Sequence, residues 1–196
     1  MKTERPILFS APMVRAILSN TKTQTRRVVK DTGLYAIDAA IHGPETAARE
    51  LLALASRCPY GIPGDRLWVR EAWGFNPDFP GLLGHIFFRA DCGHEHDGIK
   101  WRPSIHMPRA ASRITLEVTE VRVERLAIIS EADAIAEGLK PLSEGTDRTW
   151  TVDADPRSEH ESPRDTYRWL WESINGPGAW DKSPWVWVVE FRRVKP

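Results

Sequence analysis

The sequence predicts an α+β domain in which a mostly antiparallel β-sheet or barrel carries a few helices at its ends. The clearest evidence is residues 113–126, RITLEVTEVRVERL, in which apolar and charged side chains alternate as in a long strand. A second strand signal lies at 185–194, WVWVVEFRRV, and helical periodicity recurs between turn-rich segments. The chain has 196 residues, which is enough for one domain with a substantial core.

A helix is expected early in the sequence. Residues 5–10, RPILFS, form a short extended run, and Ser10 is positioned to cap a helix that begins at Ala11. This helix should end near Asn20, and its apolar face consists of Met13, Val14, Ile17 and Leu18. A second helix is expected over 44–57, with an inner face made of Ala47, Leu51, Leu52 and Ala55.

The middle of the sequence is rich in strand signals. Residues 84–91, GHIFFRAD, predict one strand. Residues 66–73, RLWVREAW, predict another, with side chains alternating between two faces, namely Leu67, Val69 and Glu71 against Trp68 and Arg70. In 113–126 the alternation slips between Val118 and Val121, so we expect a bulge or a bend in that strand.

Two helices and a polar segment are expected in the second half. Residues 130–138, SEADAIAEG, predict a short helix that Ser130 and Asp133 cap at its start. Residues 164–174, RDTYRWLWESI, predict an amphipathic helix. Residues 140–162 are polar and contain proline, so we expect an exposed and mobile insertion.

Composition and charge limit the classes of protein. The formal net charge is zero, so any contact with nucleic acid must come from a local cluster of Arg and Lys. No apolar run approaches the roughly 18 residues of a membrane span, and the first ten residues lack a signal-peptide core. The two cysteines provide no disulfide framework, so we expect a cytoplasmic protein with reduced thiols.

A zinc site is the one metal site that the sequence raises. Four residues are of the types that bind zinc, but their spacing matches no standard zinc site; they are Cys58, Cys92, His94 and His96. We therefore predict no metal and no other cofactor. The oligomeric state is not predicted.

Five short motifs follow one another along the chain. They are TKTQTRR at 21–27, PGDRLWVRE at 63–71, SRITLEVTEVRVERL at 112–126, ISEADAIAEG at 129–138 and NGPGAWDKSPWVWVVEFRRV at 175–194. In this order the chain resembles the ASCH domain, a member of the PUA-like β-barrel superfamily, most of all in its phage and prophage versions. The resemblance implies a PUA-like barrel with flanking helices, as a single domain over 1–196 with insertions at about 31–56 and 140–162.

The resemblance also implies a function. ASCH and PUA-like domains are RNA-associated barrels whose cleft can hold a nucleobase, and some ASCH members are amidohydrolases that deacetylate N4-acetylcytidine. In that branch a K-x-x-T-x-R motif and a later glutamate form the site, and the matching residues here are Lys22, Thr25, Arg27 and Glu137. Three alternatives stay open: an amidohydrolase, a non-catalytic module that binds RNA or a modified base, and a metal-independent ribonuclease. The expected partner is RNA or a modified nucleoside.

The residue types alone suffice for amide hydrolysis without a metal. The hydroxyl of Thr25 is a weak nucleophile that needs a base. Lys22 serves as that base only if its pKa falls well below the usual value of about 10.4, through burial or a nearby cation such as Arg27. Glu137 would protonate the departing amine. The alternative is that Lys22 is a solvated lysine and Glu137 a surface glutamate. If the two residues are catalytic, we expect replacement of either by alanine to leave the melting temperature nearly unchanged.

A loop of mixed aromatic and polar residues provides candidates for base recognition. Residues 101–112 contain two prolines and predict a shaped loop. Aromatic faces stack on bases and polar tips read their edges, so we expect this loop to border the site through Trp101, Arg102, Ser104 and His106. Trp68, Arg70 and Glu71 are candidates for the same cleft, although a core tryptophan and a strand salt bridge are the favoured explanation of these residues.

Overall fold

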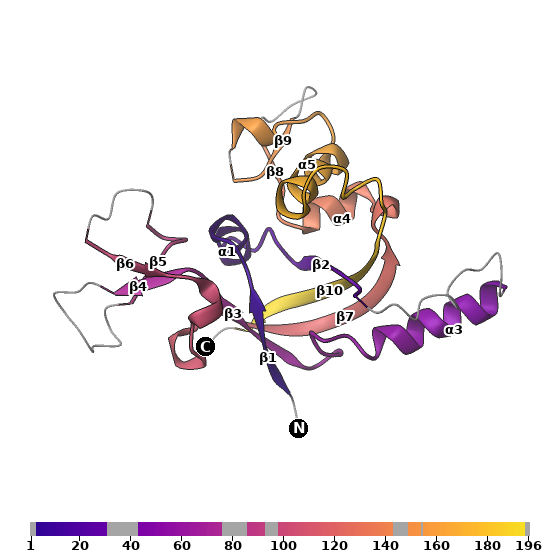
Figure 1. The fold of residues 1–196 in the computed structure, drawn as a ribbon, viewed down its shortest axis with the longest axis horizontal. Helices are drawn as coiled ribbons and strands as arrows, with labels where there is room; N and C mark the ends of the chain where they lie inside the picture. The colour runs from indigo at the N-terminus through magenta and orange to yellow at the C-terminus, as the bar shows by residue number, and fades with distance from the viewer. Residues whose placement is uncertain are drawn as a thin grey trace.

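A five-stranded sheet forms the centre of the protein (Figure 1). The computed structural model describes residues 3–30, 43–75, 86–92, 98–142, 149–153 and 155–194. In their order across the sheet, the strands are β1 (Glu4–Leu8), β3 (Arg66–Arg70), β7 (Thr115–Arg125), β10 (Trp185–Val194) and β2 (Gln24–Val28). β1 runs parallel to β3, and all other neighbours in this sheet are antiparallel.

This arrangement confirms the α+β class and the mostly antiparallel sheet. Among the described strands the sheet stays open, because β1 and β2 lie at its opposite edges and no described strand joins them. A barrel requires those two edges to pair. The closed PUA-like barrel that the resemblance implies is therefore not formed by the described strands.

The predicted irregularity in the long strand is a β-bulge. Glu190 of β10 pairs with Glu120 of β7, whereas the next residue, Phe191, pairs with Val118. Thr119 is thus an extra residue on β7, inside the interval where the apolar alternation slips. β7 is also the middle strand of the sheet.

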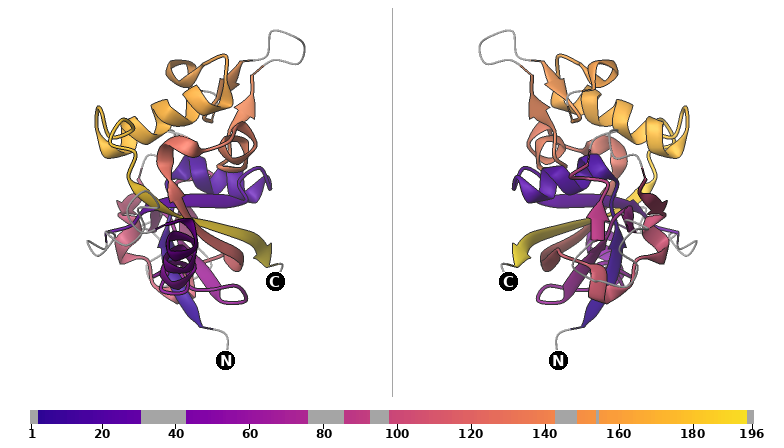
Figure 2. Two further views of the ribbon diagram at one scale, coloured as in Figure 1. Left: turned by 90° about the vertical axis from the view of Figure 1, so that its right-hand side faces the viewer. Right: turned by 90° about the vertical axis from the view of Figure 1, so that its left-hand side faces the viewer.

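Helices cover both faces of the sheet. The helices of the described residues are α1 (Ala11–Leu18), α3 (Pro44–Ala55), α4 (Glu131–Ala136) and α5 (Pro163–Asn175). Val189 of β10 belongs to the apolar core with α1 and α3, whereas Val188 belongs to a second core with α4 and α5. Neighbouring residues of a strand point to opposite faces, so the two cores lie on opposite sides of β10. Figure 2 shows α4 and α5 together above the sheet.

Smaller elements complete the described fold. A second sheet, at the left in Figure 1, has the order β5 (Ile86–Phe88), β4 (Trp73–Phe75) and β6 (Lys100–Arg102). A short hairpin above α1 pairs β8 (Lys140–Pro141) with β9 (Trp150–Thr151). The 3-10 helices are η3 (Ser104–His106), η4 (Arg109–Ala111), η5 (Leu126–Ile128) and η6 (Pro156–Ser158). None of the helices in the described ranges has the length and apolar content that crossing a membrane requires.

One prediction about exposure was wrong, and a second was wrong at two residues. Leu52 is 73% exposed, and Leu54 takes its place on the inner face of α3. The reason is helical geometry. Leu52, five residues after Ala47, projects about 140° away from it around the helix axis, whereas Leu54, seven residues after Ala47, completes almost two turns and returns to the same face. In the polar segment 140–162, Thr151 and Ser158 are buried and their hydroxyl groups share a 2.9 Å hydrogen bond. Mutual hydrogen bonding lets these polar side chains leave solvent.

Candidate functional site

The chain between α1 and β2 brings Lys22 against the end of α4. Asn20 has a positive φ of 58°, and the backbone N–H groups of Thr21 and Lys22 both donate to the carbonyl of Ala16. Lys22 then forms an isolated antiparallel bridge with Glu137. Lys22 therefore precedes the regular strand β2, so strand alternation does not hold it on the face opposite Thr25.

Glycine permits this close approach. Gly138 follows Glu137 with a φ of +103°, a conformation that other residues rarely adopt. A Cβ at Gly138 would lie 2.9 Å from the Cβ of Ala16 and 3.1 Å from the Cβ of Lys22. A side chain at this position would push apart the segments that form the site.

Lys22 and Glu137 form a buried ion pair. The Nζ of Lys22 donates to the Oε2 of Glu137 at 2.7 Å and to its backbone carbonyl at 2.8 Å. The Lys22 side chain has no exposed surface, and that of Glu137 is 3% exposed. The alternative of a solvated lysine and a surface glutamate is therefore wrong. Glu137→Ala would leave Lys22 as a buried charge without its carboxylate partner, and Lys22→Ala would remove one of the two cations that hold Glu137. The expectation that these alanine variants keep their melting temperature is therefore no longer physically supported.

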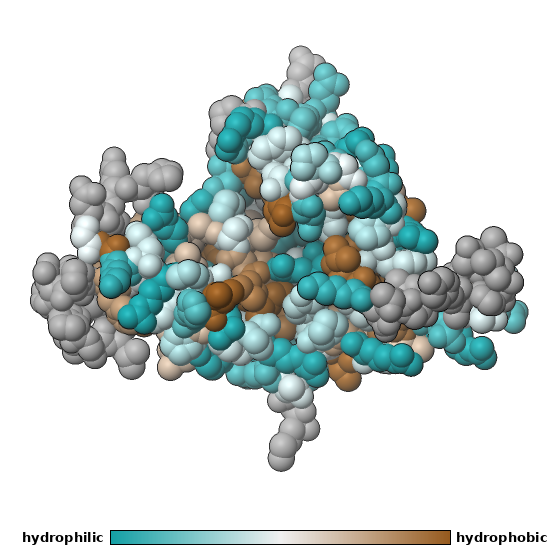
Figure 3. Space-filling view, viewed as in Figure 1, coloured by the Kyte–Doolittle hydropathy of each residue, from teal (hydrophilic) through white to brown (hydrophobic). Residues whose placement is uncertain are grey.

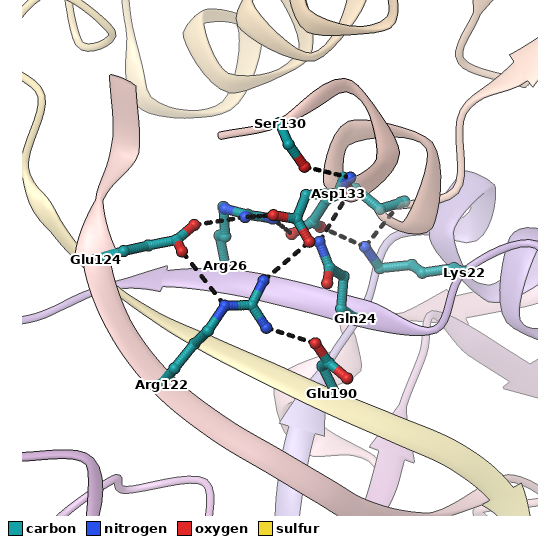
Figure 4. Close-up of polar contacts among 9 residues, drawn as sticks. Lys22, Gln24, Arg26, Arg122, Glu124, Ser130, Asp133 and Glu190 are labelled. Atoms are coloured by element: carbon teal, nitrogen blue, oxygen red, sulfur yellow. Dashed lines mark hydrogen bonds and ion pairs between the residues drawn. The ribbon is translucent and has the colours of Figure 1, made fainter. Parts of the chain in front are cut away.

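A second cation completes the pairing of Glu137. The Nη1 of Arg26 donates to the Oε1 of Glu137 at 3.1 Å, and its Nη2 donates to Glu124 at 2.6 Å. Asp133 lies 3.2 Å from the same Nη2 and also accepts from Arg122 (Figure 4). This network joins β2 and β7 to α4, so it fixes the position of the helix that carries Glu137.

The protein environment lowers the pKa of Lys22 below its usual value in water. Burial lowers the pKa of Lys22, the charge and hydrogen bond of Glu137 oppose that change, and the nearby Arg27 and Arg26 add to it. Burial also raises the pKa of Tyr167 well above its usual value, so this phenol stays neutral. Lys22 is therefore the cation of this cluster that most readily gives up a proton.

A cavity of about 80 Å³ lies beside this ion pair, between β2 and α5. Thr25 and Glu137 both line it, and the Thr25 hydroxyl makes no hydrogen bond to any described residue. Arg27 lines the same cavity, donates to the carbonyl of Leu8 at 2.7 Å and lies 5.4 Å from the ring centre of Phe9. The space suffices for several water molecules or a small chemical group.

The cavity has a wall that the sequence argument missed. One face of α5 lines it with residues at helical spacing, namely Tyr167, Leu170, Trp171, Ile174 and Asn175. Met13 of α1, Arg26 and Val28 complete the lining. The amphipathic pattern of 164–174 predicted a helix with one apolar face, but nothing local indicated that part of that face borders Thr25.

The predicted base-recognition residues lie elsewhere. Trp101 faces Arg89, with 5.1 Å between ring centre and guanidinium, and Arg102 faces Trp73 at 5.5 Å. Both belong to the small sheet with β4, and Ser104 and His106 follow in η3. None of these four predicted residues lines the cavity with Thr25.

The three candidates from 66–73 also face other partners. Arg70 donates to the carbonyl of Met107 at 3.0 Å and lies over the ring of Trp68 at 4.8 Å. Glu71 accepts two hydrogen bonds from Arg113, at 2.9 and 3.1 Å. Burial raises the pKa of Glu71, and Arg113 opposes that change. These contacts match the salt bridge and packed tryptophan that the sequence left as alternatives.

The residues considered for zinc are only partly described. Cys58 and Cys92 are both buried and free, and His94 and His96 lie outside the described residues. Within the described ranges, no three side chains of His, Cys, Asp or Glu gather as metal ligands would.

Comparison with protein-family models, with curated proteins and with solved structures finds no match to this chain.

Proposed function

We propose that this protein is an amidohydrolase that removes an acyl group from a modified cytosine nucleoside, of the N4-acetylcytidine type. One observation carries the proposal: a threonine whose hydroxyl bonds to no described residue and a glutamate paired with a buried lysine line the same cavity. The order of motifs that resembles the ASCH domain supports this proposal. A PUA-like origin of the sheet and a cytoplasmic location belong to the same proposal.

The proposed reaction begins with the Thr25 hydroxyl, which attacks the carbonyl carbon of the N4-acyl group. Lys22 passes a proton along its 2.7 Å hydrogen bond to Glu137 and then accepts the proton of Thr25, directly or through one water. The C–N bond breaks, Glu137 gives its proton to the departing amino group, and the acyl group remains as an ester of Thr25. Water then cleaves the ester to free acid.

Arg27 has a separate part in this scheme. The carbonyl oxygen becomes negative when the hydroxyl adds, and a fixed cation stabilises that charge most in a site shielded from water. Arg27 lines the cavity and is anchored through Leu8. Arg26 is committed to three acidic side chains, so its main task is to hold Glu137 in place.

The direct test is release of acetate and cytidine from N4-acetylcytidine by the purified protein. Thr25→Val should abolish release while keeping the shape of the side chain, and Thr25→Ser should retain measurable release because it keeps the hydroxyl. Equal rates for Thr25→Val and the unaltered protein would eliminate the nucleophile and, with it, the proposed mechanism.

A non-catalytic binding module is the second candidate. The favouring observation is that Lys22 is fully enclosed and already bound to Glu137 at both of its hydrogen bonds. A pair of this kind also acts as a structural anchor. Binding of N4-acetylcytidine without release of acetate would support the module, and cleavage of RNA without added metal would support the ribonuclease alternative.

A further inference from the structure

The strand that carries Thr25 has a free edge. β2 is the last strand of the sheet, with β10 as its one described neighbour. The N–H of Val29 donates to Trp185, and the carbonyl of Thr23 accepts from Phe191. Antiparallel pairing alternates, so the odd-numbered residues of β2 bond to β10 while Arg26 and Val28 direct their N–H and C=O groups away from it.

Within the described part of the chain these edge groups have no hydrogen-bond partner, and they border the cavity. No described group makes a hydrogen bond to the backbone N–H or C=O of Arg26 or of Val28. Residues 25–28 line the cavity consecutively, and α5 forms the wall across from them. The free edge therefore offers a donor and an acceptor beside the Thr25 hydroxyl.

The mouth of the cavity is apolar on both sides. Val28 on the strand is 38% exposed and Ile174 on the helix is 59% exposed. Figure 3 shows apolar surface in the middle of this face, below α5, within mainly hydrophilic surroundings. Two opposed apolar side chains suit the faces of a flat ring, and the free backbone groups suit its polar rim.

We infer that the free edge of β2 binds the Watson–Crick edge of the base, by accepting from its exocyclic N–H at the C=O of Arg26 and donating to its ring nitrogen from the N–H of Val28. A neighbouring strand in parallel pairing bonds to the same two groups through one residue. A base with an N–H beside a ring nitrogen, as in N4-acylated cytosine, presents the same pair of groups. This inference rests on the proposed function and specifies how the substrate is held.

This binding mode fits the proposed chemistry. A base paired with the strand lies near the plane of the sheet, so the faces of its acyl group point along the directions of the strand's side chains. Attack on a carbonyl carbon comes from above the amide plane. Thr25 precedes Arg26 on the strand and projects to the face opposite the Arg26 side chain, so its hydroxyl approaches from one side of the plane of the base.

The test is a binding cycle on the Thr25→Val protein, which prevents turnover and leaves the strand edge intact. The ligands are N4-acetylcytidine and its 3-deaza analogue, which lacks the ring nitrogen. The dissociation constant of each ligand is measured for the Thr25→Val protein with Val28 unchanged, with Val28→Ala and with Val28→Pro. Proline removes the N–H of Val28, which makes no bond within the sheet, and edge strands tolerate it.

With Val28 or alanine at this position, N4-acetylcytidine should bind about 3- to 10-fold more tightly than the analogue, the range for one hydrogen bond. With proline the two ligands should bind equally. A preference that survives in Val28→Pro would overturn the inference, as would equal binding of both ligands to the parent protein. Acetate release by the unaltered chain tests the proposed function separately. The two experiments therefore distinguish a failure of the binding mode from a failure of the proposed function.

Discussion

Replacing Glu137 with alanine tests whether the ion pair at the centre of the site has the burial described above. The substitution leaves Lys22 with no acidic partner among the described residues, while Arg26 keeps Glu124 and Asp133. The Lys22 side chain is fully enclosed, so water cannot replace the lost carboxylate. Breaking a buried pair in this way costs about 3–5 kcal/mol.

The assay is thermal and urea unfolding of the purified variants. For a chain of this size, each kcal/mol lowers the melting temperature by about 2–4 °C, so Glu137→Ala should melt about 6–20 °C below the parent protein. Glu137→Gln should lose less, because its amide oxygen still accepts from Lys22.

The matched control is Glu131→Ala. Glu131 is an exposed residue in the first turn of the same helix and has no described side-chain partner. Its removal should change stability by about 0.5 kcal/mol or less. A melting temperature for Glu137→Ala within about 2 °C of the parent would refute the argument, because it would mean that Lys22 reaches water or another anion.

Three further outcomes are expected. Because burial depresses the folded-state pKa of Lys22, the unfolded chain holds that proton more tightly; stability relative to Lys22→Met should therefore rise as the pH increases toward the usual lysine pKa of about 10.4, and a flat difference in urea titrations would contradict this. Gly138→Ala should destabilise more than Gly176→Ala, since both have positive φ but only Gly138 has atoms within 3.1 Å of the added Cβ; equal losses on heating would remove the steric argument. Deleting Thr119 should return β7 to regular alternation while Val118 keeps its pairing with Phe191 and Glu120 with Glu190, whereas amide cross-peaks that show a shift of either pair would count against the bulge.

Much of the fold followed from short-range patterns in the sequence. Alternation over 113–126 and 185–194 predicted the two longest strands, and a one-residue slip between Val118 and Val121 located the bulge. Periodicity and the Ser130 cap predicted α4. Such patterns are visible because each depends on residues within a few positions of one another. Leu52 shows the limit, since the inner face of its helix includes Leu54, two positions further along, in its place.

The candidate site depended on contacts that no local pattern contains. Lys22 and Glu137 are 115 residues apart, and their approach requires a glycine at 138 that fits against α1. Of two neighbouring arginines, Arg26 faces the buried acids and Arg27 the opposite core, because Val188 and Trp187 set their faces through the register with β10. The sequence by itself determined which residue types were present and which elements carried them. Only the tertiary structure decided that β2 lies at the edge of the sheet with α5 beside it, because strand order and packing depend on the whole chain folding together.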